Sequence, residues 1–123
     1  GQGMTRIPEK DRDIIEQVIY LPMVLTVLHR DLTIIQSSPF KLKNPYVIWI
    51  EQTIKIVNSD YIRAKKYLHH ENIKVNELQR DEDFTMFLFI YKGYEERHSY
   101  FNPRIRNKVE ELMKYYLYER FKQ

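Results

Sequence analysis

The chain has 123 residues, of which 43% are hydrophobic and 30% are charged. This balance excludes intrinsic disorder and indicates one globular domain with a solvated exterior. The net charge of +3 is mild, but residues 41–80 carry eight Lys and Arg against four Asp and Glu. The absence of cysteine excludes disulfides, thiolate catalysis and thiolate-bound zinc.

The first residues carry no recognisable targeting signal. Gly1, Gln2 and Gly3 precede Met4 and are typical of a cloning remnant, so we expect a single helical domain over residues 4–123. No charged and apolar signal segment follows Met4. Together with the lack of cysteine, this predicts a cytoplasmic protein.

The segment from Pro8 to Gln36 predicts a long first helix. Its apolar residues recur at alternating steps of four and three, which places them on one face of a helix. They are Ile14, Val18, Leu21, Leu25, Leu28, Leu32 and Ile35. Pro22 removes one backbone hydrogen bond inside this helix, so we expect a kink or a short break there.

A second apolar row lies about half a turn from the first, formed by Ile19, Met23, Val27 and Ile34. Either the helix runs through the centre of the domain, or this row mediates self-association or lines a pocket for an apolar ligand. The longest apolar run, VIYLPMVLTVL at residues 18–28, is about half of the roughly 20 residues that span a bilayer. From the second apolar row we expect a homodimer, and from the short apolar run we expect no membrane partner.

A second helix is predicted from Asn44, because Asn followed by Pro45 is a favourable helix start. Its apolar row is Val47, Ile50, Ile54, Val57, Tyr61, Ala64 and Leu68. The opposite face carries a basic ridge of Lys55, Arg63, Lys66 and His70. Such a ridge can contact nucleic-acid phosphates, or it can simply keep the surface soluble and complement the helix dipole.

Residues 84–101 fit two structures. Phe84, Phe87, Tyr91, Tyr94 and, further on, His98 and Phe101 keep a three-four spacing that favours a third helix. The same stretch is rich in aromatic and β-branched residues, and YKGY can close a hairpin. We expect the helix, and keep a hairpin within residues 73–101 as the alternative.

A last helix is predicted from Asn102, with Pro103 at its first position. Ile105, Val109, Leu112 and Tyr116 share its apolar face. Arg104, Arg106 and Lys108 lie at its start, where free backbone amides also favour an anion. These three residues extend the possible nucleic-acid surface.

The spacing from Arg63 to His69 or His70 resembles the Arg, four-to-six residues, His motif of the HEPN family of helical-bundle ribonucleases. In that family the pair lies in a dimer cleft and handles the scissile phosphate without a metal. The resemblance implies phosphate binding by Arg63 and proton transfer by His70. Here Ala64 follows the arginine, where the family usually has a polar residue, and the motif lies in the second helix rather than late in the bundle.

Other chemistry finds little support. Glu95 and His98 give one Glu-x-x-His step, whereas a di-metal bundle needs two such pairs, so we expect no metal site. No serine is flanked by the glycines of a nucleophile elbow, so we expect no serine nucleophile. The serines considered are Ser37, Ser38, Ser59 and Ser99. The sole glycine after Gly3 is Gly93, which excludes a glycine-rich phosphate loop and predicts no cofactor.

These patterns predict an all-α protein, an antiparallel bundle of about four helices. The function we expect is that of a small non-enzymatic binding or regulatory protein that acts through protein–protein contacts and self-associates. A nucleic-acid-binding module is the first alternative, and a HEPN-like ribonuclease is the second.

Overall fold

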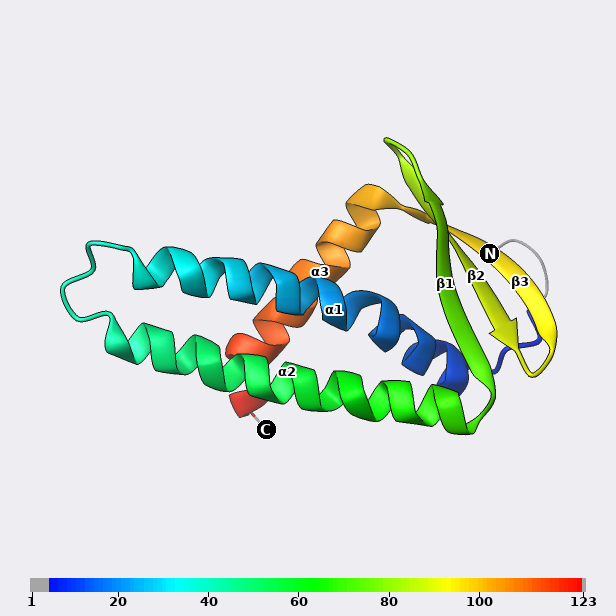
Figure 1. The fold of residues 1–123 in the computed structure, drawn as a ribbon, viewed down its shortest axis with the longest axis horizontal. Coiled ribbons are helices and arrows are strands. Elements are labelled where there is room, and N and C mark those ends of the chain that lie inside the picture. The colour runs from blue at the N-terminus through cyan, green and yellow to red at the C-terminus, as the bar shows by residue number, and fades with distance from the viewer. Residues whose placement is uncertain (1–4, 123) are drawn as a thin grey trace.

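The computed structural model describes residues 5–122 and contains three long helices and a three-stranded sheet (Figure 1). The prediction about residues 1–3 lies outside the described residues. In chain order the elements are α1 (Glu9–Gln36), α2 (Asn44–His70), β1 (Ile73–Arg80), β2 (Phe84–Tyr91), β3 (Tyr94–Phe101), α3 (Asn102–Leu117) and a final 3₁₀ turn, η1 (Glu119–Lys122). The protein is therefore α+β.

The helices predicted from Pro8, Asn44 and Asn102 all form, and each begins within one residue of the predicted start. A kink or a short break was predicted at Pro22, and a break does not occur, because α1 is one helix from Glu9 to Gln36. Antiparallel α1 and α2 make a long hairpin, and α3 crosses behind it (Figure 1).

The predicted all-α four-helix bundle is wrong, because residues 73–101 form an antiparallel meander in the order β1-β2-β3. The alternative, an α+β fold with a hairpin at residues 73–101, is closer to the structure, which has three strands there instead of two. Lys92 and Gly93 connect β2 to β3 with φ of 51° and 92°. Two successive positive φ angles are typical of the two-residue turns whose twist matches that of paired strands. A helix through Gly93 is thereby excluded.

The sheet packs one face against the helices. Along β2, Thr85, Phe87, Phe89 and Tyr91 are buried and alternate with half-buried residues on the outer face. Phe89 is fully buried and joins the core formed by α1, α2 and α3. The sheet covers one end of the helical hairpin, and the other end extends away from it (Figure 1).

A buried carboxylate joins three of these elements. Asp11, in the first turn of α1, is 6% exposed. Its Oδ1 accepts a hydrogen bond of 2.6 Å from the Tyr67 hydroxyl of α2, and its Oδ2 accepts one of 2.6 Å from the Tyr91 hydroxyl of β2. Both carboxylate oxygens are thus satisfied, and the start of α1 is held to the end of α2 and to the central strand.

By length and composition, α1 is apolar enough to cross a membrane, with a mean hydropathy of 1.5 over an 18-residue window. The core helix of a soluble domain passes the same test. In this structure Ile15, Leu21, Val24 and Leu28 of α1 are fully buried within the protein.

We expect Asp11→Ala to lower the free energy of unfolding by about 2 kcal/mol, because two largely buried tyrosine hydroxyls lose their charged acceptor. Chemical denaturation followed by circular dichroism measures the change. The control is Asp13→Ala, an exposed aspartate in the same helix, which should leave the midpoint almost unchanged. Equal effects of the two substitutions would contradict a structural role for Asp11.

The pH dependence of stability should report the same contact. Hydrogen bonds from Tyr67 and Tyr91 hold the pKa of Asp11 below its ordinary value of 3.8, although burial opposes them. The pKa of Asp11 is lower in the folded protein than in the unfolded protein. The contribution of Asp11 to stability is therefore complete above the unfolded-state pKa and is lost as the pH falls through the folded-state pKa. Unfolding measured at decreasing pH should therefore show a steeper loss below about pH 4 for the unmodified protein than for Asp11→Asn.

Candidate functional site

A groove of about 760 Å³ lies where α1, β3 and α3 meet. Its volume is in the range of known ligand sites, which is roughly 300–1,000 Å³. The α1 side contributes Arg12, Glu16 and Tyr20, and β3 is the edge strand that borders it. Three segments that are distant in the sequence therefore form one concave surface.

One face of α3 forms the remaining wall. Arg104, Asn107, Lys108 and Glu111 line the groove, at the three-four spacing that places side chains on a single helix face. Ile105 and Val109 point into the core instead. Arg106 does not line the groove, since it lies two residues from Arg104 and hence on the other side of the helix.

Three cations of the groove have no carboxylate partner. Within residues 5–122, no ion pair of 4.0 Å or less involves Arg97, Arg104 or Lys108. All three side chains are exposed. Unpaired cations that converge on a concave surface from two elements raise the local positive potential and favour an anionic ligand.

Glu16 of α1 already has two partners within the groove, Tyr100 of β3 and Arg12. Its Oε2 accepts a hydrogen bond of 2.9 Å from the Tyr100 hydroxyl and lies 3.9 Å from Nε of Arg12. Burial raises the pKa of Tyr100, and the neighbouring Glu16 raises it further. Burial and Glu16 also raise the pKa of Tyr20 to about 12. Both phenols therefore stay neutral at physiological pH, and the Tyr100 hydroxyl donates its hydrogen bond to Glu16.

Strand β3 is fixed beneath the groove by His98 and Glu96. The His98 ring stacks on Phe89 with a centroid distance of 4.6 Å, and its Nε2 lies 2.9 Å from Oε1 of Glu96. Glu96 also accepts hydrogen bonds from the Thr5 hydroxyl and from the Arg6 backbone amide. Burial by itself would raise the pKa of Glu96, but these three donors together lower it. His98 is a structural member of this cluster.

The structure separates the residues predicted to bind nucleic acid into two groups. Arg104 and Lys108 line the groove, whereas Lys55, Arg63, Lys66 and His70 are exposed along α2 and do not. Two members of the α2 ridge already have acidic neighbours. Arg63 lies 3.2 Å from Asp60, and His70 lies 3.1 Å from Glu71.

The Arg63 and His70 pair does not form a cleft in this chain. Their side chains are 76% and 85% exposed, and two helical turns separate them by about 10 Å. The helical bundle that the HEPN resemblance implied is replaced by an α+β fold.

The second apolar row of α1 is not a continuous surface. Ile19 is 5% exposed and belongs to the core, Met23 and Val27 are half-buried, and Ile34 is 55% exposed. Ile19 and Met23 line a smaller cavity of about 390 Å³ with Tyr61 of α2 and residues of β1 and β2.

Glu95 and His98 cannot share an ion, because residues three apart on a strand point to opposite faces of the sheet. Their partners across the sheet confirm this, since Glu95 is opposite Ile90 and His98 is opposite the buried Phe87. Within residues 5–122 no group of three or more potential ligand residues can hold a metal ion.

Sequence reasoning missed Arg12, Glu16, Tyr20 and Arg97 of the groove. Arg12 and Arg97 are 85 positions apart, and neither has a local motif. Only the strand assignment of residues 94–101 would have shown that Arg97 lies on the edge strand that borders the groove.

A helical hairpin capped at one end by a three-stranded sheet, with a basic groove beside the edge strand, defines a small α+β domain. The chain belongs to the YhjD protein family, whose model matches residues 6–121. It is 44% identical over 115 residues to the uncharacterized protein YhjD of Bacillus subtilis (strain 168), with 94% of this chain and 96% of that protein covered. No solved structure gives a significant match.

Proposed function

We propose that the protein is a non-enzymatic binding module that takes an acidic segment of a partner protein in the groove between α1, β3 and α3. The observation that carries this proposal is the convergence of Arg97, Arg104 and Lys108 on one concave surface without a carboxylate within 4.0 Å among residues 5–122. Carboxylates of a partner supply the missing counter-charges.

The edge of β3 supports an extended partner. A strand at the edge of a sheet presents backbone N–H and C=O groups on its open side, and extended peptides commonly bind by adding a strand there. Here β3 pairs with β2 on one side, and the groove borders the other. An added strand would place alternate side chains toward Arg104 and Lys108 of α3.

Nucleic acid is the second candidate partner, because aromatic side chains accompany the same cations. Tyr20, Phe84 and Phe101 line the groove, and the rings of Phe84 and Phe101 lie 5.4 Å apart. Aromatic faces stack on unpaired bases while cations contact the phosphates. This candidate also rests on Arg104 and Lys108.

One experiment tests the groove and separates the two partners. The tagged protein, the groove variant Arg104→Glu with Lys108→Glu, and the control variant Arg30→Glu with Lys74→Glu are used to capture partners from source-cell lysate, with and without nuclease. Arg30 and Lys74 are exposed and do not line the groove. The two variants reverse the same number of charges. We expect the groove variant to lose roughly tenfold or more of the captured partner while the control retains it.

A nuclease-resistant partner with an acidic segment supports the protein proposal. Loss of the captured material after nuclease treatment, with a steep decrease of binding as salt rises, supports nucleic acid. Equal capture by the groove variant and the unmodified protein would contradict both.

Self-association through the second apolar row of α1 stays a prediction. Val27 is half-buried on α1, and Met23 lies one turn before it. Because a glutamate there would be desolvated between two copies, Val27→Glu should convert a dimer into a monomer in sedimentation equilibrium, with an unchanged circular dichroism spectrum. A monomeric unmodified protein at all concentrations would contradict this prediction.

A further inference from the structure

The end of the α1–α2 hairpin that lies away from the sheet carries an unusual concentration of exposed apolar side chains. Of the fourteen large hydrophobic residues that are exposed in residues 5–122, six lie within residues 34–49. They are Ile34, Phe40, Leu42, Tyr46, Ile48 and Trp49, which we call the hairpin-end patch. Leu42, in the connecting loop, is 74% exposed. A patch of this kind marks an interaction surface.

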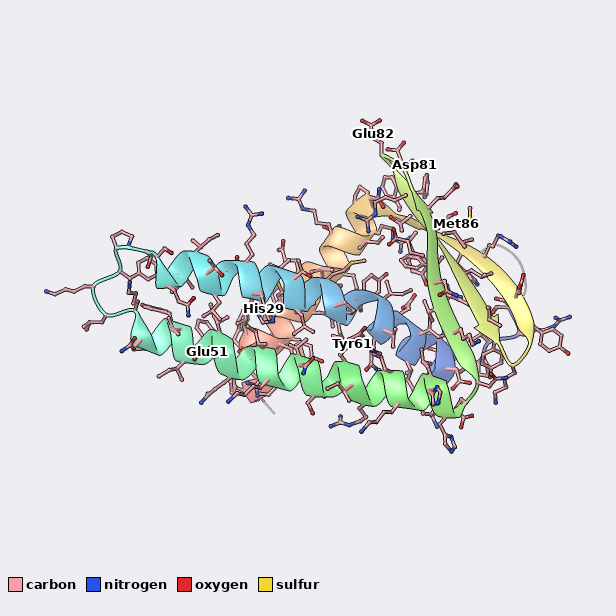
Figure 2. All side chains as sticks on the ribbon, in the orientation of Figure 1. His29, Glu51, Tyr61, Asp81, Glu82 and Met86 are labelled. Carbon is pink, nitrogen blue, oxygen red and sulfur yellow. The ribbon has the colours of Figure 1, made fainter. Side chains whose placement is uncertain are left out.

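The chain segment that carries the hairpin-end patch has charges of one sign. Residues 32–50 contain no Asp or Glu and contain two lysines, Lys41 and Lys43. Along the two helices the next acids in the sequence are Asp31 on α1 and Glu51 on α2, the latter set back from the connecting loop in Figure 2. Glu119 follows Leu117, whose carbonyl accepts from Trp49 at the inner border of the patch. Asp31 and Glu51 each lie roughly 8–10 Å from the hairpin end along their helices, given 1.5 Å per residue. The acid-free zone is therefore about as deep as the layer that interfacial helices occupy, roughly 5–10 Å.

Side chains of the hairpin end satisfy several of the carbonyls at the end of α1. The Lys43 ammonium donates hydrogen bonds to the carbonyls of Gln36, at 2.8 Å, and Ser38, at 3.4 Å. The hydroxyls of Ser37 and Ser38 donate to carbonyls of the last turn of α1. Carbonyls at a helix end otherwise require water. The last turn of α1 therefore needs little water, and the exposed backbone of residues 39–42 can remain in the hydrated headgroup layer.

We propose that the hairpin end docks on an anionic lipid surface, with Phe40, Leu42 and Trp49 entering the interfacial layer and Lys41 facing lipid phosphates. The acid-free zone matches a negatively charged bilayer and supplies no carboxylates for the lysines of a second copy. The patch residues come from both helices and the loop between them. This end of the hairpin protrudes away from the sheet (Figure 1). A fluid layer can enclose such an end, whereas a rigid protein face would need a matching hollow.

This inference revises the expectation of no membrane partner, which considered only a spanning segment. The hairpin docks without crossing, because the fully buried residues of α1 pack inside the protein. It is also independent of the groove, which lies at the sheet end of the molecule and includes no residue of the hairpin-end patch.

The protein carries its own probe of docking. Trp49 is the one tryptophan in the sequence and is 40% exposed, with its Nε1 donating a hydrogen bond of 3.0 Å to the Leu117 carbonyl. Transfer of a half-exposed indole into the interfacial layer shifts its fluorescence emission to shorter wavelength. Vesicles of phosphatidylcholine with phosphatidylglycerol should cause this shift and carry the protein upward in a flotation gradient. Vesicles of phosphatidylcholine alone should do so much less.

The decisive variant is Leu42→Glu, with Leu78→Glu as its matched control. Both replace an exposed leucine by glutamate, and Leu78 lies in β1 at 44% exposure, far from the hairpin end. We expect Leu42→Glu to weaken binding to the anionic vesicles by about tenfold or more, and Leu78→Glu to retain it. Lys41→Glu provides a second variant and should weaken binding to anionic vesicles while the circular dichroism spectrum stays unchanged.

Three results would overturn the proposal. One is the absence of flotation and of a fluorescence shift with anionic vesicles. Another is an equal loss of binding in Leu42→Glu and Leu78→Glu. The third is a concentration-dependent dimer that Leu42→Glu dissociates, in a protein that binds neither kind of vesicle, because the hairpin end would then be an interface between copies.

Discussion

The two hydrogen bonds that Asp11 accepts, from Tyr67 and from Tyr91, fix the position of the sheet on the helical hairpin. A carboxylate taken out of water destabilises a protein unless each oxygen finds a donor, and here each oxygen has one from a different element. The next residue, Arg12, and the one a turn later, Glu16, line the groove. The position of the α1 wall relative to β3 therefore depends on a contact that lies outside the groove itself.

The helices were readable from the sequence because each keeps its apolar residues on one face and two of them begin with Asn-Pro. The sheet was not. Met86, Leu88 and Ile90 make the outer face of β2 apolar as well, so the alternation that identifies a strand is missing. Phe84, Phe87 and Tyr91 then match a helical spacing by coincidence. Gly93 carried the correct signal, because glycine adopts a positive φ without steric cost, as the second position of this turn requires.

The groove was predictable only in part, for a related reason. Arg104 and Lys108 were identified because they share a face of a correctly predicted helix. Arg97 was predicted to lie in a helix, and a helix over residues 84–101 does not indicate that Arg97 and α3 border the same groove. Arg12 lies on the polar side of α1 among other charged residues, so nothing in its local sequence distinguishes it. A charge cluster built from three elements has no periodicity of its own, so composition and spacing cannot reveal it before the topology is known.

Strand β3 passes into α3 without any intervening residue, since Phe101 ends the strand and Asn102 begins the helix. Asn102 is also bound to the β1–β2 turn. Its backbone amide donates to the Asp83 carbonyl at 2.7 Å, and its side-chain amide donates to the Asp81 carbonyl at 3.0 Å. Its side-chain oxygen accepts from the Thr85 hydroxyl at 2.7 Å. The junction thus has no linker residue, and these hydrogen bonds hold the start of α3 to the sheet. Whatever occupies the space between them meets a rigid receptor, so its affinity is not reduced by the entropy of ordering a loop or closing a lid.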